Sequence, residues 1–100
     1  MTTKRTAAEK DEFFQIGKAY FVRTVIYHQI GVLRRIVKIG SFVGLELENA
    51  VWCADSGRFT QAMRDGTLSE VELFSGNIVV NLNAISDVAE WNHTVPTVQK

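Results

Sequence analysis

The sequence predicts a mainly β fold: a small, strongly bent five-stranded antiparallel barrel with an N-terminal helix and a short inserted helix. Runs of β-branched and aromatic residues, short turns between the runs, and glycines at several bends predict this fold. Glycines permit the close strand approach that a small barrel requires. One hundred residues correspond to a single domain, which we expect to span residues 1–100.

The N-terminal part predicts a loose tail followed by one short helix. Residues 1–5 are polar and form the expected tail. Thr6 suits a helix cap, because Glu9 lies three residues later as in a capping box, and Gly17 is placed to end the helix. We expect this helix to cover an open end of the β structure.

Three long strands are expected next, over residues 20–28, 31–39 and 42–54. Gly31 predicts a bulge or a sharp bend, because a residue without a Cβ atom lets two backbones approach. Gly40 and Ser41 form the expected turn between the second and third strands. Glu46 and Glu48 alternate with leucines, so we expect one face of the third strand to meet water.

A short helix is expected over residues 56–65, between the third and fourth strands. Phe59, Ala62 and Met63 follow the i, i+3, i+4 spacing of one helix face, and Gly66 sits just past the expected end. Either Asp55 or Ser56 is a suitable cap residue at the start of this helix.

The last third of the sequence predicts short strands and a tail. Two turn-linked strands are expected over residues 70–74 and 78–82, and residues 85–91 read as a continuation or a sixth strand. Trp52 and Trp91 are expected in the core or at an interface. Residues 92–100 are polar around Pro96, so we expect a C-terminal tail there.

The charges balance overall but are unevenly distributed. Eleven basic and eleven acidic residues give a net charge of zero, which argues against a globally basic nucleic-acid binder. Residues 1–40 hold eight basic and three acidic side chains, and residues 41–100 hold three basic and eight acidic ones. This asymmetry admits three interpretations: a basic face toward phosphate, attraction between copies, or ordinary surface charge.

Neither a catalytic site nor a metal site is predicted. Cys53 is the only cysteine, so an intrachain disulfide cannot form, and a reducing compartment is expected. His28 and His93 show no metal-ligand spacing with it, and no nucleophile–base pair stands out. The first ten residues lack an apolar signal core, and no apolar run is long enough to cross a membrane. We therefore expect a cytoplasmic protein that is not an enzyme, with no cofactor and no membrane contact.

Two segments share a pattern with a known family. Residues 31–34 and 45–50 combine a glycine with alternating hydrophobics from the second strand into the third. Residues 74–80 combine a hydrophobic residue, a glycine and a β run. With the element order, this pattern resembles the Sm-like (Lsm) domain family over about residues 13–91, apart from a helical insert at residues 55–69. The chain is identified as a divergent member.

The resemblance implies a homo-oligomeric ring in which the fourth strand of one copy pairs with the fifth strand of the next. The expected interface residues are Val71, Leu73, Ile78 and Val80. It also implies that loops at the pore bind single-stranded RNA. The family's aspartate and asparagine are missing from residues 38–44, and Ser75 replaces an arginine, so an unchanged uridine site is not expected.

Two groups of residues are candidates for contact with RNA. The first supplies positive charge and a ring on which a base can stack: Arg34, Arg35, Lys38 and Phe42. The second offers backbone amides in a turn: Ser75, Gly76 and Asn77. The alternatives are a solvated basic turn and a plain β-turn. The competing hypothesis for the whole chain is an oligomeric scaffold of the same fold that has lost RNA binding.

Overall fold

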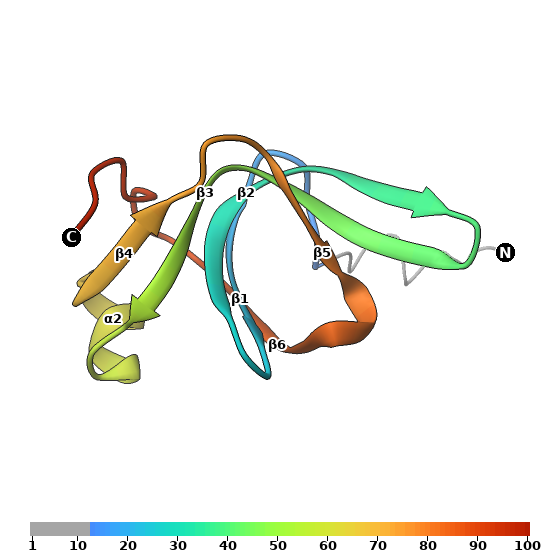
Figure 1. Ribbon diagram of the computed structural model, residues 1–100. Helices are drawn as coiled ribbons and strands as arrows, with labels where there is room; N and C mark the ends of the chain where they lie inside the picture. Colours follow the sequence, from blue (N-terminus) through green and yellow to red (C-terminus); the bar gives the residue numbers. More distant parts are fainter. Residues whose placement is uncertain (1–12) are drawn as a thin grey trace, which may run out of the picture.

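The computed structural model describes residues 13–100 and shows a mainly β protein (Figure 1). Its strands, in chain order, are β1 (Ala19–Thr24), β2 (His28–Ile39), β3 (Phe42–Asp55), β4 (Glu70–Leu73), β5 (Ile78–Asn81) and β6 (Ile85–Glu90). Helix α2 (Phe59–Asp65) lies between β3 and β4, and a 3-10 turn, η1 (Leu82–Ala84), joins β5 to β6. The single inserted helix and the mainly β class were both predicted from the sequence.

The six strands form one open antiparallel sheet, in the order β4-β3-β2-β1-β6, with β5 also paired to β3. β4 pairs with residues 51–55 of β3, and β5 pairs with residues 44–47 of the same strand. The two strands expected to be linked by a turn both align along β3, whose length accommodates two partners, and residues 75 and 76 form a bend between them. The expected five-stranded closed barrel is wrong, because β6 is a separate sixth strand and the sheet does not close.

Two irregularities bend the hairpin formed by β2 and β3, as Figure 1 shows. The register shifts between Ile30 and Val32, where Gly31 faces Asn49 and Ala50. A Cβ atom added to Gly31 would lie 2.9 Å from the Cβ of Leu47, so only glycine allows this approach. Asn49 adopts a left-handed φ of 53° at the same point. The bend predicted at Gly31 is confirmed.

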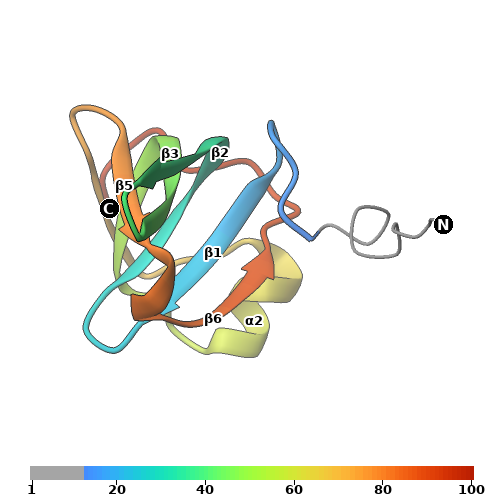
Figure 2. The same cartoon turned by 90° about the vertical axis from the view of Figure 1, so that its right-hand side faces the viewer.

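The bent sheet buries side chains on both faces. One core lies between the sheet and α2 and contains Phe21, Ile30, Val51, Cys53, Ala62, Leu68, Val71 and Trp91. The other lies inside the bend and contains Tyr20, Val22, Leu33, Leu45, Leu47, Ala50 and Val80. β1 supplies both cores because its successive side chains point to opposite faces. Figure 2 shows β1 passing between β6 and the bent hairpin, beside α2.

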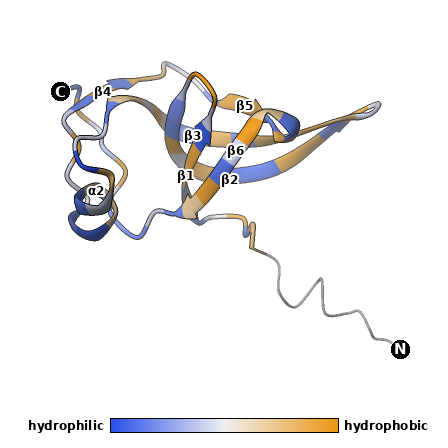
Figure 3. Ribbon diagram, turned by 90° about the horizontal axis from the view of Figure 1, so that it is seen from below, coloured by the Kyte–Doolittle hydropathy of each residue, from blue (hydrophilic) through white to orange (hydrophobic). Residues whose placement is uncertain are grey.

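The short helix is amphipathic, which is why it covers one face of the sheet. Ala62 is fully buried, and Figure 3 shows that most of α2 is hydrophilic, whereas hydrophobic and hydrophilic stretches alternate along the strands. The Arg23 guanidinium lies 4.3 Å from the centre of the Phe59 ring, joining β1 to the helix. Gly66 ends the helix in the left-handed conformation, as predicted.

Two expectations about helix ends differ from the structure. The N-cap of α2 is Arg58, which makes no side-chain capping bond, whereas the Asp55 carboxylate accepts the Gly57 N–H at 2.8 Å. The cap expected at residue 55 or 56 is wrong, because that carboxylate stabilises the turn before the helix. The helix expected from Thr6 to residue 16 lies mostly outside the described residues, and residues 13–17 form a bend and a turn.

Residues 91–100 run back along the sheet to the outer edge of β4. Trp91 is buried, and its indole N–H donates to the Thr94 carbonyl at 3.3 Å. Val71 and Lys100 exchange two backbone hydrogen bonds, at 3.1 and 3.0 Å. The expected tail has no helix or strand of its own, but it covers the outer edge of β4. Over residues 13–100, no helix has the length and apolar character needed to span a membrane.

Candidate nucleic-acid interface

A bulge brings Arg34 and Arg35 to the same face of the sheet. The register of β2 and β3 shifts between Leu33 and Arg35, so Arg34 is an extra residue on its strand. Arg35 Nε donates to Glu46 Oε1 at 2.5 Å, and Arg34 Nε lies 3.7 Å from Glu46 Oε2. Arg34 Nη1 is 3.4 Å from Glu48 Oε1. Adjacent residues of a regular strand would point to opposite faces, so the bulge explains the pairing.

Glu46 is the centre of this cluster, which we call the Glu46 cluster: Arg34, Arg35, Glu46, Glu48 and Asn77. The residue is only 8% exposed, and Asn77 Nδ2 donates to Glu46 Oε2 at 2.9 Å, tying the segment between β4 and β5 to β3. Hydrogen bonds from Arg35 and then Asn77 hold the pKa of Glu46 below its ordinary value. The expectation that this face of β3 meets water is therefore wrong at Glu46.

The Glu46 cluster predicts a pH-dependent stability difference. The folded pKa of Glu46 lies below the ordinary value of 4.5, so its ion pairs stabilise the fold above that value. That contribution is lost as the pH falls through the folded pKa. We expect Glu46→Gln to be less stable than the wild type at about pH 6, and the difference to shrink toward about pH 3. Urea midpoints across this range measure it, and a constant difference would contradict it.

The structure separates Lys38 from the two arginines. The hairpin register pairs Arg35 with Glu46 and Lys38 with Val43, and the alternation of β2 places Arg35 and Lys38 on opposite faces. Phe42 shares the face of Glu46, because the two are four residues apart on β3. Its ring lies close over Gly44, where an added Cβ would be 3.0 Å from Phe42 Cε1. Phe42 and the Glu46 cluster therefore lie on the same face of the sheet, which we call the outer face, and Lys38 lies on the opposite face.

The three residues of the second candidate group do not share the same contacts. Asn77 belongs to the Glu46 cluster, whereas Ser75 and Gly76 are exposed in the segment between β4 and β5. An added Cβ at Gly76 would meet no atom within 4 Å, so the backbone there is open to approach. Val79 is 47% exposed and pairs with Glu46, adding an apolar side chain to the same outer face.

Of the four expected interface residues, two point into the cores. Val71 is 1% exposed and Val80 is 6% exposed, so only their backbones can reach another chain. Leu73 is 40% exposed beside the C-terminal segment, and Ile78 is half-buried. A contact between copies through these strands would rely on backbone edges and on Leu73 rather than on the valines.

Several basic side chains of residues 1–40 form ion pairs with acidic side chains of residues 41–100 in the same chain. Arg23 makes a bidentate pair with Asp87 at 2.7 and 2.5 Å, and Lys18 lies 3.3 Å from Glu90. Both pairs join β1, or the residue before it, to β6 across the sheet. Together with the Glu46 cluster, they match cations of residues 1–40 with anions of residues 41–100. Attraction within one copy therefore accounts for Lys18, Arg23, Arg34 and Arg35 among the basic residues of residues 1–40.

Glu46 is the site residue that the sequence-based prediction omitted. A two-residue turn at Gly40 and Ser41 makes Ile39 face Phe42, and counting back along both strands places Arg35 opposite Glu46. Opposite charges facing each other across strands stabilise a sheet. The turn position and this charge complementarity were the signals that could have identified the pair.

The chemistry of Cys53 fits a structural role. Its side chain is 3% exposed in the core beneath α2, and burial, with a smaller effect of Asp55, raises the pKa of the thiol to about 11. A protonated thiol is a poor nucleophile. Within residues 13–100, no group of three or more histidine, cysteine, aspartate or glutamate side chains could hold a metal ion.

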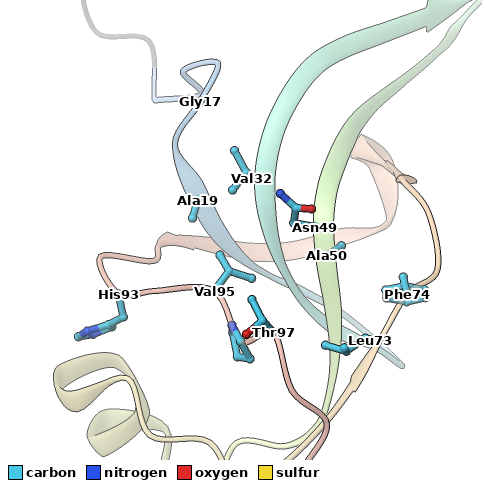
Figure 4. Close-up of a pocket in the computed structure, with 11 residues that line it drawn as sticks. Gly17, Ala19, Val32, Asn49, Ala50, Leu73, Phe74, His93, Val95 and Thr97 are labelled. Atoms are coloured by element: carbon cyan, nitrogen blue, oxygen red, sulfur yellow. The ribbon is translucent and has the colours of Figure 1, made fainter.

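One cavity of about 480 Å³ lies between the C-terminal segment and the sheet (Figure 4). Its lining comprises Gly17, Ala19, Val32, Asn49, Ala50, Leu73, Phe74, His93, Val95, Pro96 and Thr97. Figure 4 shows His93, Val95 and Thr97 on the side of the C-terminal segment and Leu73 and Phe74 opposite. His93 Nε2 lies 2.7 Å from the Met63 carbonyl, which anchors the start of that segment to α2.

Comparisons of the chain with protein-family models, curated proteins and solved structures find no match.

Proposed function

We propose that this chain is a self-assembling, ring-forming protein of Sm-like type that binds single-stranded RNA on its outer face. The observation that supports assembly is the open sheet. β5 pairs only with β3 and β6 pairs only with β1 among the described strands, so each leaves an outer edge without a strand partner. Unpaired edges of this kind are templates for pairing with another chain.

The pairing we propose joins the outer edge of β5 in one copy to the outer edge of β6 in the next. Such a contact uses two different surfaces of each copy, and it closes into a ring where the rotation between copies permits. This choice of edges replaces the pairing of β4 with β5, because the C-terminal segment already occupies the outer edge of β4.

The assembly is tested by a proline placed on the outer edge of β6. Trp91 N–H donates to the Ala19 carbonyl, and the antiparallel alternation then directs the Glu90 N–H outward. Glu90→Pro removes that donor without removing a backbone hydrogen bond to β1, although it also removes the ion pair between Glu90 and Lys18. We expect an oligomer for the wild type and monomers for Glu90→Pro in sedimentation equilibrium.

The matched control is Lys100→Pro, which places a proline beside β4, an edge that the proposed ring does not use. This variant should form the same ring as the wild type, because the outer edges of β5 and β6 are unchanged. A monomeric wild-type protein at high concentration, or equal loss of assembly in both variants, would contradict the proposal.

The RNA part of the proposal rests on the outer face. Phe42 supplies an aromatic ring, and Arg34 and Arg35 supply two guanidinium groups. The side chains of Arg34 and Arg35 are 56% and 66% exposed, respectively. Single-stranded nucleic acid is commonly bound by aromatic stacking beside positive charge. The half-buried Phe42 ring, held over Gly44, offers a preorganised surface for one base.

RNA binding is tested by fluorescence anisotropy with short oligonucleotides at low salt. Phe42→Ala should weaken binding by about 1–3 kcal/mol, because it removes one stacked base. Arg35→Gln should lower both the affinity and its salt dependence. Lys38→Gln removes the same charge from the opposite face and should leave the affinity close to that of the wild type. Equal losses for Arg35→Gln and Lys38→Gln would contradict this assignment of the face.

A scaffold without RNA binding is the second candidate, and the Glu46 cluster favours it. Glu46 and Glu48 neutralise the charges of Arg34 and Arg35, and two carboxylates beside the arginines weaken attraction for phosphate. Under this alternative the wild type assembles, and oligo-U, oligo-A and mixed RNA all fail to bind at low salt.

A further inference from the structure

We propose that the outer edge of β4 is a docking groove for residues 94–100 of a second copy, which replace the chain's own residues 94–100 by exchange. The groove consists of the β4 backbone and the cavity of about 480 Å³ beside it. It is distinct from the edges of β5 and β6 used in the proposed ring.

The first argument is the way in which the segment binds within one chain. Val71 N–H donates to the Lys100 carbonyl at 3.1 Å, and Lys100 N–H donates to the Val71 carbonyl at 3.0 Å. Leu73 N–H lies 3.4 Å from Gln99 Oε1. These contacts place an extended peptide on a strand edge, which is a recurrent mode of peptide recognition. The β4 edge therefore accepts a peptide of this sequence.

The second argument is that the segment is poorly packed where it lies. Pockets of about 480 and 290 Å³ that open to solvent border it, and residues 97–100 are exposed. Val95 is the residue of this segment that packs against the core. Few contacts therefore oppose its release from the edge.

The third argument is charge. Glu70 and Glu72 are exposed on β4, and Glu70 faces Asp55 across the sheet. Within residues 13–100, neither glutamate makes an ion pair. Residues 94–100 bring one positive charge, Lys100, to this acidic edge. A peptide with a cationic residue is therefore the chemically matched occupant.

A second copy satisfies these requirements because its residues 94–100 are identical. Exchange of an identical element between protomers recreates every contact at low cost. The chain's own segment competes with an effective concentration of about millimolar, so exchange is favoured at high protein concentration or when the intrachain contact is weakened.

The test uses a fluorescent synthetic peptide of residues 94–100. Lys100→Pro in the full chain removes the backbone N–H that donates to the Val71 carbonyl. The substitution leaves Val95 and Pro96 unchanged in the sequence. We expect the peptide to bind this variant at least tenfold more tightly than the wild type. Amide exchange at Val71 and Leu73 should be at least tenfold faster in the variant, and the peptide should reverse this.

Two controls separate this groove from the ring. A peptide with the same Lys100→Pro change should not bind the variant, and Glu72→Lys should weaken binding of the unchanged peptide. Glu90→Pro, placed on β6, should leave peptide binding intact even if the ring is lost. Equal binding of both peptides, unchanged exchange at Val71, or no preference for the variant would each overturn the proposal.

Discussion

Phe21→Ala is expected to reduce the free energy of unfolding by about 3–5 kcal/mol, the usual cost of deleting a buried phenylalanine side chain. Phe21 is 1% exposed, and its ring lies 5.7 Å from the Phe59 ring and 5.9 Å from the Trp91 ring, measured between centroids. It therefore joins β1 to α2 and to the residue after β6. A domain of this size typically has only about 5–15 kcal/mol of stability, so the variant should be marginal.

The matched control is Phe74→Ala. Phe74 is 38% exposed at the cavity beside β4, so its loss removes far less buried area than the loss of Phe21. Urea unfolding followed by circular dichroism measures both variants, with equal denaturant slopes as the condition for comparing them. Similar midpoints for the two variants would show that Phe21 does not have the central packing role described.

Gly31→Val is expected to destabilise the sheet by about 1–3 kcal/mol or more through overpacking. An added Cβ would lie 2.9 Å from the Leu47 Cβ, 3.1 Å from the Ala50 Cβ and 3.3 Å from the Ala50 Cα. The last of these atoms is backbone, so the two strands must separate. Because the bend of the hairpin forms at this point, the core inside the bend would open as well.

Gly76→Val is the control for this experiment, because a Cβ at Gly76 meets no atom within 4 Å. The two variants add the same side chain, so the difference in their thermal midpoints reports the local environment. We expect a lowered midpoint for Gly31→Val and a change within experimental error for Gly76→Val. Equal effects would contradict the close approach of β2 to β3 at Gly31.

The strands and the short helix were readable from local pattern. β3 was predicted to within one residue, and Gly66 ends α2 as predicted, because alternation and a left-handed cap are properties of neighbouring residues. Residues 20–28, in contrast, were expected to be one strand, whereas β1 ends at Thr24 and residues 25–27 form the turn into β2. Val25 and Ile26 are 89% and 77% exposed there, so their β-branched side chains suggested a strand that the fold does not make.

The candidate site was predicted in composition but not in arrangement. The sequence pointed to Arg34, Arg35 and Asn77, and the structure brings them together on Glu46. Lys38 was grouped with them because it is near in sequence, yet strand alternation places it on the other face. A one-residue bulge decides which charges share a face, and a bulge at Arg34 has no signature in the local pattern.

The sequence alone therefore determined the mainly β class, the inserted helix and the bend at Gly31, since each depends on a few adjacent residues and on their steric preferences. Only the tertiary structure decided that β4 and β5 both lie along β3, that β6 is a sixth strand, and that residues 94–100 cover the β4 edge. Those pairings join residues far apart in the chain, and many registers satisfy the same alternation of polar and apolar residues. The choice among them is made by packing of the two cores, which no local pattern encodes.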